Sequence, residues 1–181
     1  MKRFIVTGLL LIVMLSLYSL KIGGIQLPDE TDKYGANLQL NGAGLRKKVV
    51  IKVYAGGLYL PQKNSNAHEV ILLNDPMFMR MHFIYKKVDN QKLIDAWLEG
   101  FSPVLDNFSK EITQFNAMFS TPALKGDVYD ILYIPGKGTA VVINGVNQGF
   151  VPGYEFKKAV FSIWLGENSA LPKLKEKLLG L

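Results

Sequence analysis

The stretch LNGAGLRKKVVIKVYAGGLYLP, residues 40–61, decides the fold of this chain. Residues 41–44 are Asn, Gly, Ala and Gly, the small and permissive residues that a tight turn needs. The residues that follow alternate as in a strand, with Val49, Ile51 and Val53 on one face and Val50, Lys52 and Tyr54 on the other. The pattern predicts a glycine-rich turn that leads into a strand, with Arg46 at the mouth of a sheet. A buried anion site is the leading hypothesis.

The rest of the chain divides into strand-like and helix-like segments. Strand periodicity covers 77–84, 128–134 and 139–146, and a turn at 147–149 precedes a last short strand at 150–151. Helical periodicity covers 90–101, 105–119, 156–165 and 173–179. Residues 67–73 fit either a helical turn or an edge strand. Short hairpins between strands, with the helices partly segregated, predict an α+β fold on an antiparallel sheet.

Composition limits the class of protein. The chain has 181 residues, of which 49% are hydrophobic, enough for one domain with an ample core. The formal charge of +6 falls to +3 without Lys2, Arg3 and Lys21, too mild and scattered to indicate nucleic acid. There is no cysteine and only His68 and His82, so we expect no disulfide and no metal site. The glycine segments 136–138 and 42–44 lack the full phosphate-loop and dinucleotide-binding motifs, so we expect no cofactor.

The amino terminus, residues 1–24, has the pattern of a targeting segment. Lys2 and Arg3 precede an uncharged apolar run from 4 to 20, which ends at Lys21. The pattern predicts a signal peptide, cut after Ser19 or Gly24, or an uncleaved anchor. Either way we expect an exported protein, periplasmic if cleaved, with one folded domain over 25–181. Residues 26–34 are expected to be a solvated lead-in, and the domain to begin near Ala36.

Several longer motifs carry a resemblance to a known family. They are GAGLR and KVYAGGLYLP within 40–61, GDVYDILYIPGKGTAVVINGV at 126–146, YEFKKAVFSIWLGE at 154–167 and the closing LPKLKEKLLG. The chain resembles the chalcone isomerase family, most closely its bacterial chalcone isomerase-like branch. The resemblance implies an open-faced β-sandwich, a large antiparallel sheet with helices packed on one face. The family contains flavonoid-cyclising isomerases and non-catalytic members that bind fatty acids.

Two residues stand out as candidate ligand contacts. By itself, Arg46 beside two lysines is typical of a solvated charge, and Tyr54 in a strand is typical of packing. The resemblance implies instead that Arg46 lies in the ligand cleft, where a guanidinium can hold a carboxylate bidentately. It also implies that Tyr54 helps to hold the anion, at a place where the isomerases carry a threonine; Tyr59 is the alternative.

The chain departs from the isomerases at their other polar positions. Residues 89–99 contain no tyrosine and offer Trp97 or Leu98 near the place of an asparagine. Phe156, Lys157 and Lys158 stand near the place of a Thr-Ser pair. These differences predict an apolar pocket with one cation at its mouth. Such a pocket lacks the polar groups that would orient a flavonoid for cyclisation.

The resulting hypothesis is a non-catalytic protein that binds a small amphipathic anion, such as a fatty acid, in the cleft between sheet and helices. Arg46 and Tyr54 would hold the head of the ligand, and its tail would lie against Phe83, Leu93 and Trp97. One alternative is an isomerase, an intramolecular lyase of the chalcone isomerase type. Another is a structural or interaction module of the envelope whose pocket is filled by side chains.

Overall fold

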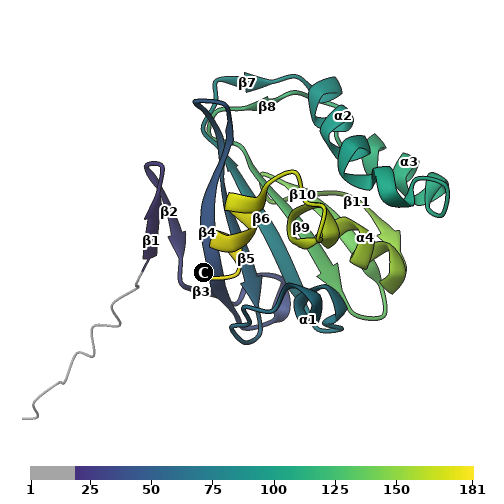
Figure 1. Cartoon of the computed structure of the whole chain (residues 1–181), viewed down its shortest axis with the longest axis horizontal. Helices are drawn as coiled ribbons and strands as arrows, with labels where there is room; N and C mark the ends of the chain where they lie inside the picture. The colour runs from purple at the N-terminus through teal and green to yellow at the C-terminus, as the bar shows by residue number, and fades with distance from the viewer. Residues whose placement is uncertain (1–18) are drawn as a thin grey trace, which may run out of the picture.

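A curled, seven-stranded antiparallel sheet forms the centre of the computed structural model, which describes residues 19–181 (Figure 1). Its strand order is β11-β10-β9-β6-β5-β4-β3. The strands are β3 (Glu30–Thr31), β4 (Leu38–Lys48), β5 (Ile51–Leu60), β6 (Met77–Phe83), β9 (Val128–Ile134), β10 (Gly138–Ile143) and β11 (Val146–Pro152). Two small two-stranded sheets accompany it: the hairpin of β1 (Ser19–Ile22) with β2 (Ile25–Pro28), and the pair of β7 (Lys87–Val88) with β8 (Ala123–Leu124), between which two α-helices lie in the chain. The predicted α+β class is confirmed.

Five helices complete the fold, and most of them cover one face of the sheet, as predicted. They are α1 (Ala67–Leu72), α2 (Asn90–Phe101), α3 (Ser109–Ala117), α4 (Tyr154–Leu165) and α5 (Pro172–Leu178), with 3-10 turns at Lys33–Gly35 and Ser102–Val104. Residues 67–73 are therefore helical rather than an edge strand. Among residues 19–181, no helix is both long and apolar enough to cross a membrane.

The main core lies between the sheet and these helices. Alternate residues of β6 point into it, because a strand places every second side chain on the same face. Met77, Met79, Met81 and Phe83 are all buried there, in one apolar cluster that also contains aromatic side chains of α2, α3 and α4. The strongly apolar face predicted for residues 77–84 is thus the helix-covered face.

The glycine-rich motif is not a turn, and that prediction is wrong. Gly42 and Gly44 lie inside β4, and the turn comes later, at Val49 and Val50. A Cβ atom on Gly42 would lie 2.2 Å from the carbonyl oxygen of Lys177, and one on Gly44 would lie 2.8 Å from the Lys177 Cβ. The glycines therefore let α5 approach the strand closely.

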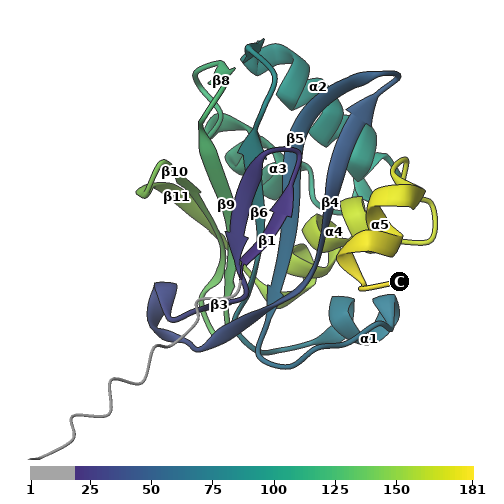
Figure 2. The same ribbon diagram turned by 90° about the vertical axis from the view of Figure 1, so that its left-hand side faces the viewer.

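The segment before β4 is also more ordered than the sequence suggests. Leu27 is fully buried, and the β1–β2 hairpin lies over the face of the sheet that faces away from α4 and α5 (Figures 1 and 2). Residues 26–34 are thus part of the domain, which corrects the prediction of a solvated lead-in. The predicted targeting segment lies outside the described residues except for 19–24, which form β1 and its turn.

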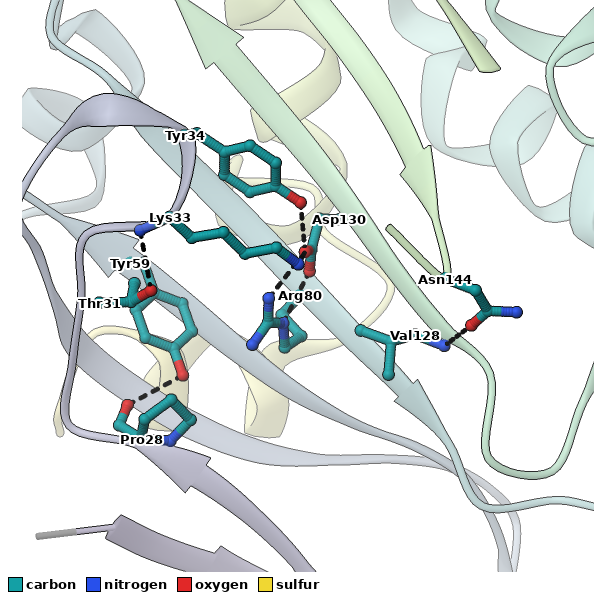
Figure 3. Close-up of polar contacts among 9 residues, drawn as sticks. All are labelled: Pro28, Thr31, Lys33, Tyr34, Tyr59, Arg80, Val128, Asp130 and Asn144. Carbon is teal, nitrogen blue, oxygen red and sulfur yellow. Dashed lines mark hydrogen bonds and ion pairs between the residues drawn. The ribbon is translucent and has the colours of Figure 1, made fainter. Parts of the chain in front are cut away.

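A polar cluster fastens this amino-terminal segment to the sheet (Figure 3). Arg80 of β6 holds Asp130 of β9 through two hydrogen bonds of 2.7 Å, and Tyr34 and Lys33 donate to the same carboxylate at 2.7 and 3.1 Å. Burial would raise the pKa of Asp130, but the hydrogen bonds and charge of Arg80 outweigh it and hold the pKa below its usual value. Both carboxylate oxygens are occupied, so the cluster is a structural clamp.

One boundary near the carboxyl end also differs from the prediction. β11 begins at Val146, and the turn before it is formed by Asn144 and Gly145, whose φ angles are +50° and +83°. Residues 147–149 are strand, not turn. Asn-Gly is the favoured pair for a two-residue hairpin because both residues tolerate positive φ.

Candidate functional site

A cleft of about 1080 Å³ opens between the sheet and its helices. It is bounded by the ends of β4 and β5, by α2 and the 3-10 turn after it, by α4 and by the loop to α5. Its apolar lining includes the side chains of Met81, Leu93, Trp97, Val104, Ile163 and Trp164. A volume of this size can hold a small organic ligand with most of its surface buried.

Arg46 and Tyr54 line this cleft from neighbouring strands. They are directly opposite each other in the β4–β5 pairing and face the helices. Tyr54 is buried, and its hydroxyl oxygen accepts a hydrogen bond of 3.0 Å from Nε1 of Trp164. Burial raises the pKa of Tyr54 although the charge of Arg46 opposes this, so the phenol stays neutral at physiological pH. Its own O–H remains available as a donor.

The guanidinium of Arg46 is half-buried, and within residues 19–181 it takes part in no ion pair. This contrasts with Arg80, whose charge is neutralised by Asp130. The cleft therefore has a cation without a counterion among residues 19–181, beside a neutral phenol and within reach of apolar walls. Such a set of groups can hold an anionic head group and an apolar body at the same time.

A family model described as chalcone isomerase-like matches residues 19–180. The chain belongs to the chalcone isomerase-like family. The solved structure of a fatty-acid binding protein from Arabidopsis thaliana superposes with a TM-score of 0.74 over 90% of this chain and 96% of that chain, at 18% identity. No curated protein matches the sequence significantly.

The two other residues weighed as ligand contacts lie elsewhere in this chalcone isomerase-like fold. Tyr59 faces the opposite side of the sheet, where it stacks on Phe78 and donates to the carbonyl of Pro28 at 3.0 Å. Phe83 packs against Tyr54 with ring centroids 5.7 Å apart and does not line the cleft. It supports the site from beneath, whereas Leu93 and Trp97 line it as expected.

The expectation of a single cation at the mouth is wrong. Four lysines line the cleft in addition to Arg46: Lys48, Lys87, Lys92 and Lys158. Lys87 and Lys92 pair with Asp89, and Lys158 pairs with Glu155. Lys48 has no ion pair among the described residues, so Arg46 and Lys48 are the unpaired cations of the lining.

Sequence reasoning missed Trp164, which orients the hydroxyl of Tyr54. The only available signal was its type, since a buried indole N–H needs an acceptor. The indole N–H of Trp97 is also buried, and it has no acceptor within residues 19–181. Because unpaired buried donors are rare, this N–H is a further group that a ligand atom or a water molecule could satisfy.

Phe156 and Lys157, which stand near the isomerases' Thr-Ser pair, point away from the cleft. Lys157 is fully buried, and its Nζ donates to the carbonyls of Ile71 and Leu73 at 2.7 and 2.6 Å, at the end of α1. Burial lowers the pKa of Lys157 to about 8, whereas these carbonyls favour the charged form. Its role is therefore to cap a helix, and only Lys158 of this group reaches the cleft.

A second depression, of about 410 Å³, lies at the opposite end of β4. Its lining is polar and includes Glu30 and Asp32 but no basic side chain. It therefore offers no cation for an anionic head, and its only large apolar lining residues are Leu38 and Pro61. The two histidines lie apart from each other, and no cluster of three metal-binding side chains occurs among residues 19–181.

Proposed function

We propose that the protein binds a small amphipathic anion, such as a fatty acid, in the cleft between sheet and helices. The observation that carries this proposal is the guanidinium of Arg46, which has no ion pair among residues 19–181 and lies opposite the buried Tyr54 in a partly apolar cleft of about 1080 Å³. A carboxylate could accept hydrogen bonds from both groups, and the apolar walls would take the chain. The name of the Arabidopsis protein of similar fold supports the same ligand class.

The two alternative functions have less support. A structural module with a filled pocket fits poorly with an open cleft of this volume. An isomerase would need groups such as a tyrosine and an asparagine to orient a flavonoid, but the part of the lining that comes from α2 contains neither. It consists of Lys92, Leu93, Asp95, Ala96, Trp97, Glu99 and Gly100. We therefore propose a binding protein rather than an enzyme. We also propose that it is exported, because Lys2 and Arg3 precede an uncharged apolar run.

The test is calorimetric titration with a long-chain fatty acid and with its methyl ester, which lacks the charge. Hydrogen bonds to a charged group contribute about 1.5 to 3 kcal/mol, so Arg46→Ala should weaken binding of the acid roughly ten- to hundredfold. Arg46→Lys should recover only part of the loss, because lysine keeps the charge but not the planar fork. The ester should bind the parent more weakly than the acid does.

Lys47→Ala is the matched control, because Lys47 is the next residue but is exposed and does not line the cleft. It should leave the affinity almost unchanged. Lys48→Ala should have a small effect, since its side chain is exposed at the rim. Equal binding of acid and ester by the parent, or equal losses for Arg46→Ala and Lys47→Ala, would contradict the proposed anion site.

A further inference from the structure

The most exposed apolar side chains of the described molecule lie at the tip of the β4–β5 hairpin. Val49 and Val50 are 91% and 85% exposed, and the neighbouring Ile51 is 43% exposed. β6 pairs with β5 only from Tyr54 onward, so the hairpin projects beyond the sheet as a two-stranded arm. Both views place the tip of this arm at the same end of the molecule as β8 and the start of α2 (Figures 1 and 2).

The turn itself is an unusual one. Val49 has a φ of +57°, a left-handed conformation that is rare for a β-branched residue and easily adopted by glycine. A two-residue hairpin turn gains nothing within the fold from a valine at this position, because the side chain touches almost only solvent. Two valines at the tip of a strained turn are therefore suited to contact something outside the molecule.

The surroundings of the tip are strongly basic. The arm tip, the β7–β8 strand pair and the start of α2 lie at one end of the molecule in both views (Figures 1 and 2). These segments carry seven exposed lysines: Lys47, Lys48, Lys52, Lys86, Lys87, Lys92 and Lys125. They include only two carboxylates, Asp89 and Asp127. The expectation of a scattered charge is thus wrong.

The rest of the molecule is nearly neutral, so this basic end is distinctive. Apart from Lys2 and Arg3 and the segments just named, the chain holds 12 basic and 13 acidic side chains. An exposed apolar tip surrounded by lysines matches a membrane surface, where valines enter the interfacial layer and lysines meet anionic head groups. A nucleic acid would use the lysines but would offer no apolar layer to the valines.

We propose that this basic end, with the Val49–Val50 tip, docks on an anionic lipid bilayer. Lys48 and Ile51 belong to both the tip region and the cleft lining, so docking brings the cleft mouth to the membrane. The membrane contact stands on the tip and its charges. The purpose of this contact would be to exchange an amphipathic ligand between the cleft and the bilayer, and this part rests on the proposed function.

The full chain has no cysteine, so a single Cys at Val50→Cys can carry an environment-sensitive nitrobenzoxadiazole dye. Vesicles of phosphatidylcholine and phosphatidylglycerol in equal parts should raise its fluorescence and shift it to the blue. Pure phosphatidylcholine should have a much weaker effect, and molar salt should reverse the shift because it reduces the Debye length to about 3 Å. The dye senses the environment of position 50 only, so membrane binding through the amino-terminal segment alone would not change its signal.

Ser65→Cys is the matched control site, because Ser65 is exposed in the loop at the other end of β5 and should report no change. Each lysine near an anionic surface contributes roughly fivefold in affinity, so Lys47→Gln with Lys52→Gln should raise the half-saturating lipid concentration about 25-fold. Lys63→Gln with Lys137→Gln, in exposed turns at the far end of the sheet, should change it little.

A dye at position 50 that stays in water while these vesicles are present would overturn the docking proposal. So would a salt-sensitive complex with duplex DNA in place of vesicle binding, which would assign the basic end to nucleic acid. The proposed ligand site fails separately: if soluble fatty acid does not bind while the tip inserts, the docking holds and the cleft proposal is wrong. If the tip does not insert while soluble fatty acid still binds, the docking proposal is wrong and the cleft proposal holds.

Discussion

Arginine serves two different purposes on the two faces of this sheet. On the face covered by the β1–β2 hairpin, Arg80 forms an ion pair with Asp130 and lies over the ring of Phe78, 5.3 Å from its centroid. On the helix-covered face, Arg46 has no counterion among residues 19–181. A charge already satisfied by the fold holds structure together, whereas an unsatisfied charge beside a cleft is free to bind.

We predict that Asp130→Asn destabilises the protein by about 3 kcal/mol at pH 7, because it leaves Arg80 partly buried without its counterion. The folded pKa of Asp130 lies below its unfolded value of about 3.9. Its contribution is therefore present above about pH 4 and is lost as the pH falls through the folded pKa. Urea denaturation should show the gap between parent and variant shrinking below pH 4.

Arg80→Met combined with Asp130→Leu is the control for that experiment. Removing both partners leaves no buried charge, so the double variant should lose less free energy of unfolding than the two single losses together. A gap between parent and Asp130→Asn that is the same at pH 7 and pH 3 would contradict the assigned role of the carboxylate.

At the scale of elements, β4 is the strand on which several features meet. Its glycines admit α5, its Asn41 side chain donates to the carbonyl of Leu178 at 2.8 Å, and its far end carries Arg46. α5 in turn follows the loop that closes one side of the cleft. The position of the anion site along the strand therefore depends on the close packing of β4 with α5.

We predict that Gly42→Ala destabilises the protein by roughly 1–3 kcal/mol, the usual cost of overpacking, because the new methyl group would meet backbone atoms of residues 177–180. Gly44→Ala is the matched comparison on the same strand face. Its Cβ would meet the Lys177 and Leu174 side chains at 2.8 and 3.0 Å, which can move more easily. Thermal denaturation should show the larger loss at Gly42, and equal losses would be inconsistent with a backbone clash.

At the scale of the whole molecule, the cleft and the basic end share one opening. The long arm and α2 border the cleft, and the same segments carry most of the exposed lysines at this end. The lysines of this end attract anions, although Asp95, Glu99, Glu155 and Glu167 of the cleft lining offset part of their charge. An enzyme must also orient its bound substrate for reaction, which binding alone does not require.

We predict that the purified protein does not accelerate the cyclisation of chalcone above the spontaneous rate. The cleft has a cation and a phenol, but the α2 wall of its lining contains neither a tyrosine nor an asparagine to orient a flavonoid. The measurement is the loss of chalcone absorbance with and without protein at neutral pH. Catalysed turnover that disappears in Arg46→Ala would instead support the isomerase alternative.

The sequence by itself determined the periodic elements and the family. The alternation of Met77, Met79, Met81 and Phe83 predicts a half-apolar strand, and the spacing of Leu93, Trp97 and Phe101 predicts a helix, because each period puts its apolar side chains on one face. The motif resemblance pointed to the family and to Arg46 and Tyr54, and the structure has these two residues facing each other across the β4–β5 pair.

Only the tertiary structure decided what depends on contacts between distant segments. Whether Gly42 serves a turn or a close approach depends on where α5 arrives, and whether Tyr54 has a partner depends on Trp164 of α4. The clamp at Asp130 joins β6, β9 and the segment before β4. Local periodicity reflects the backbone geometry of one element, whereas these contacts reflect how elements pack, which no short pattern contains.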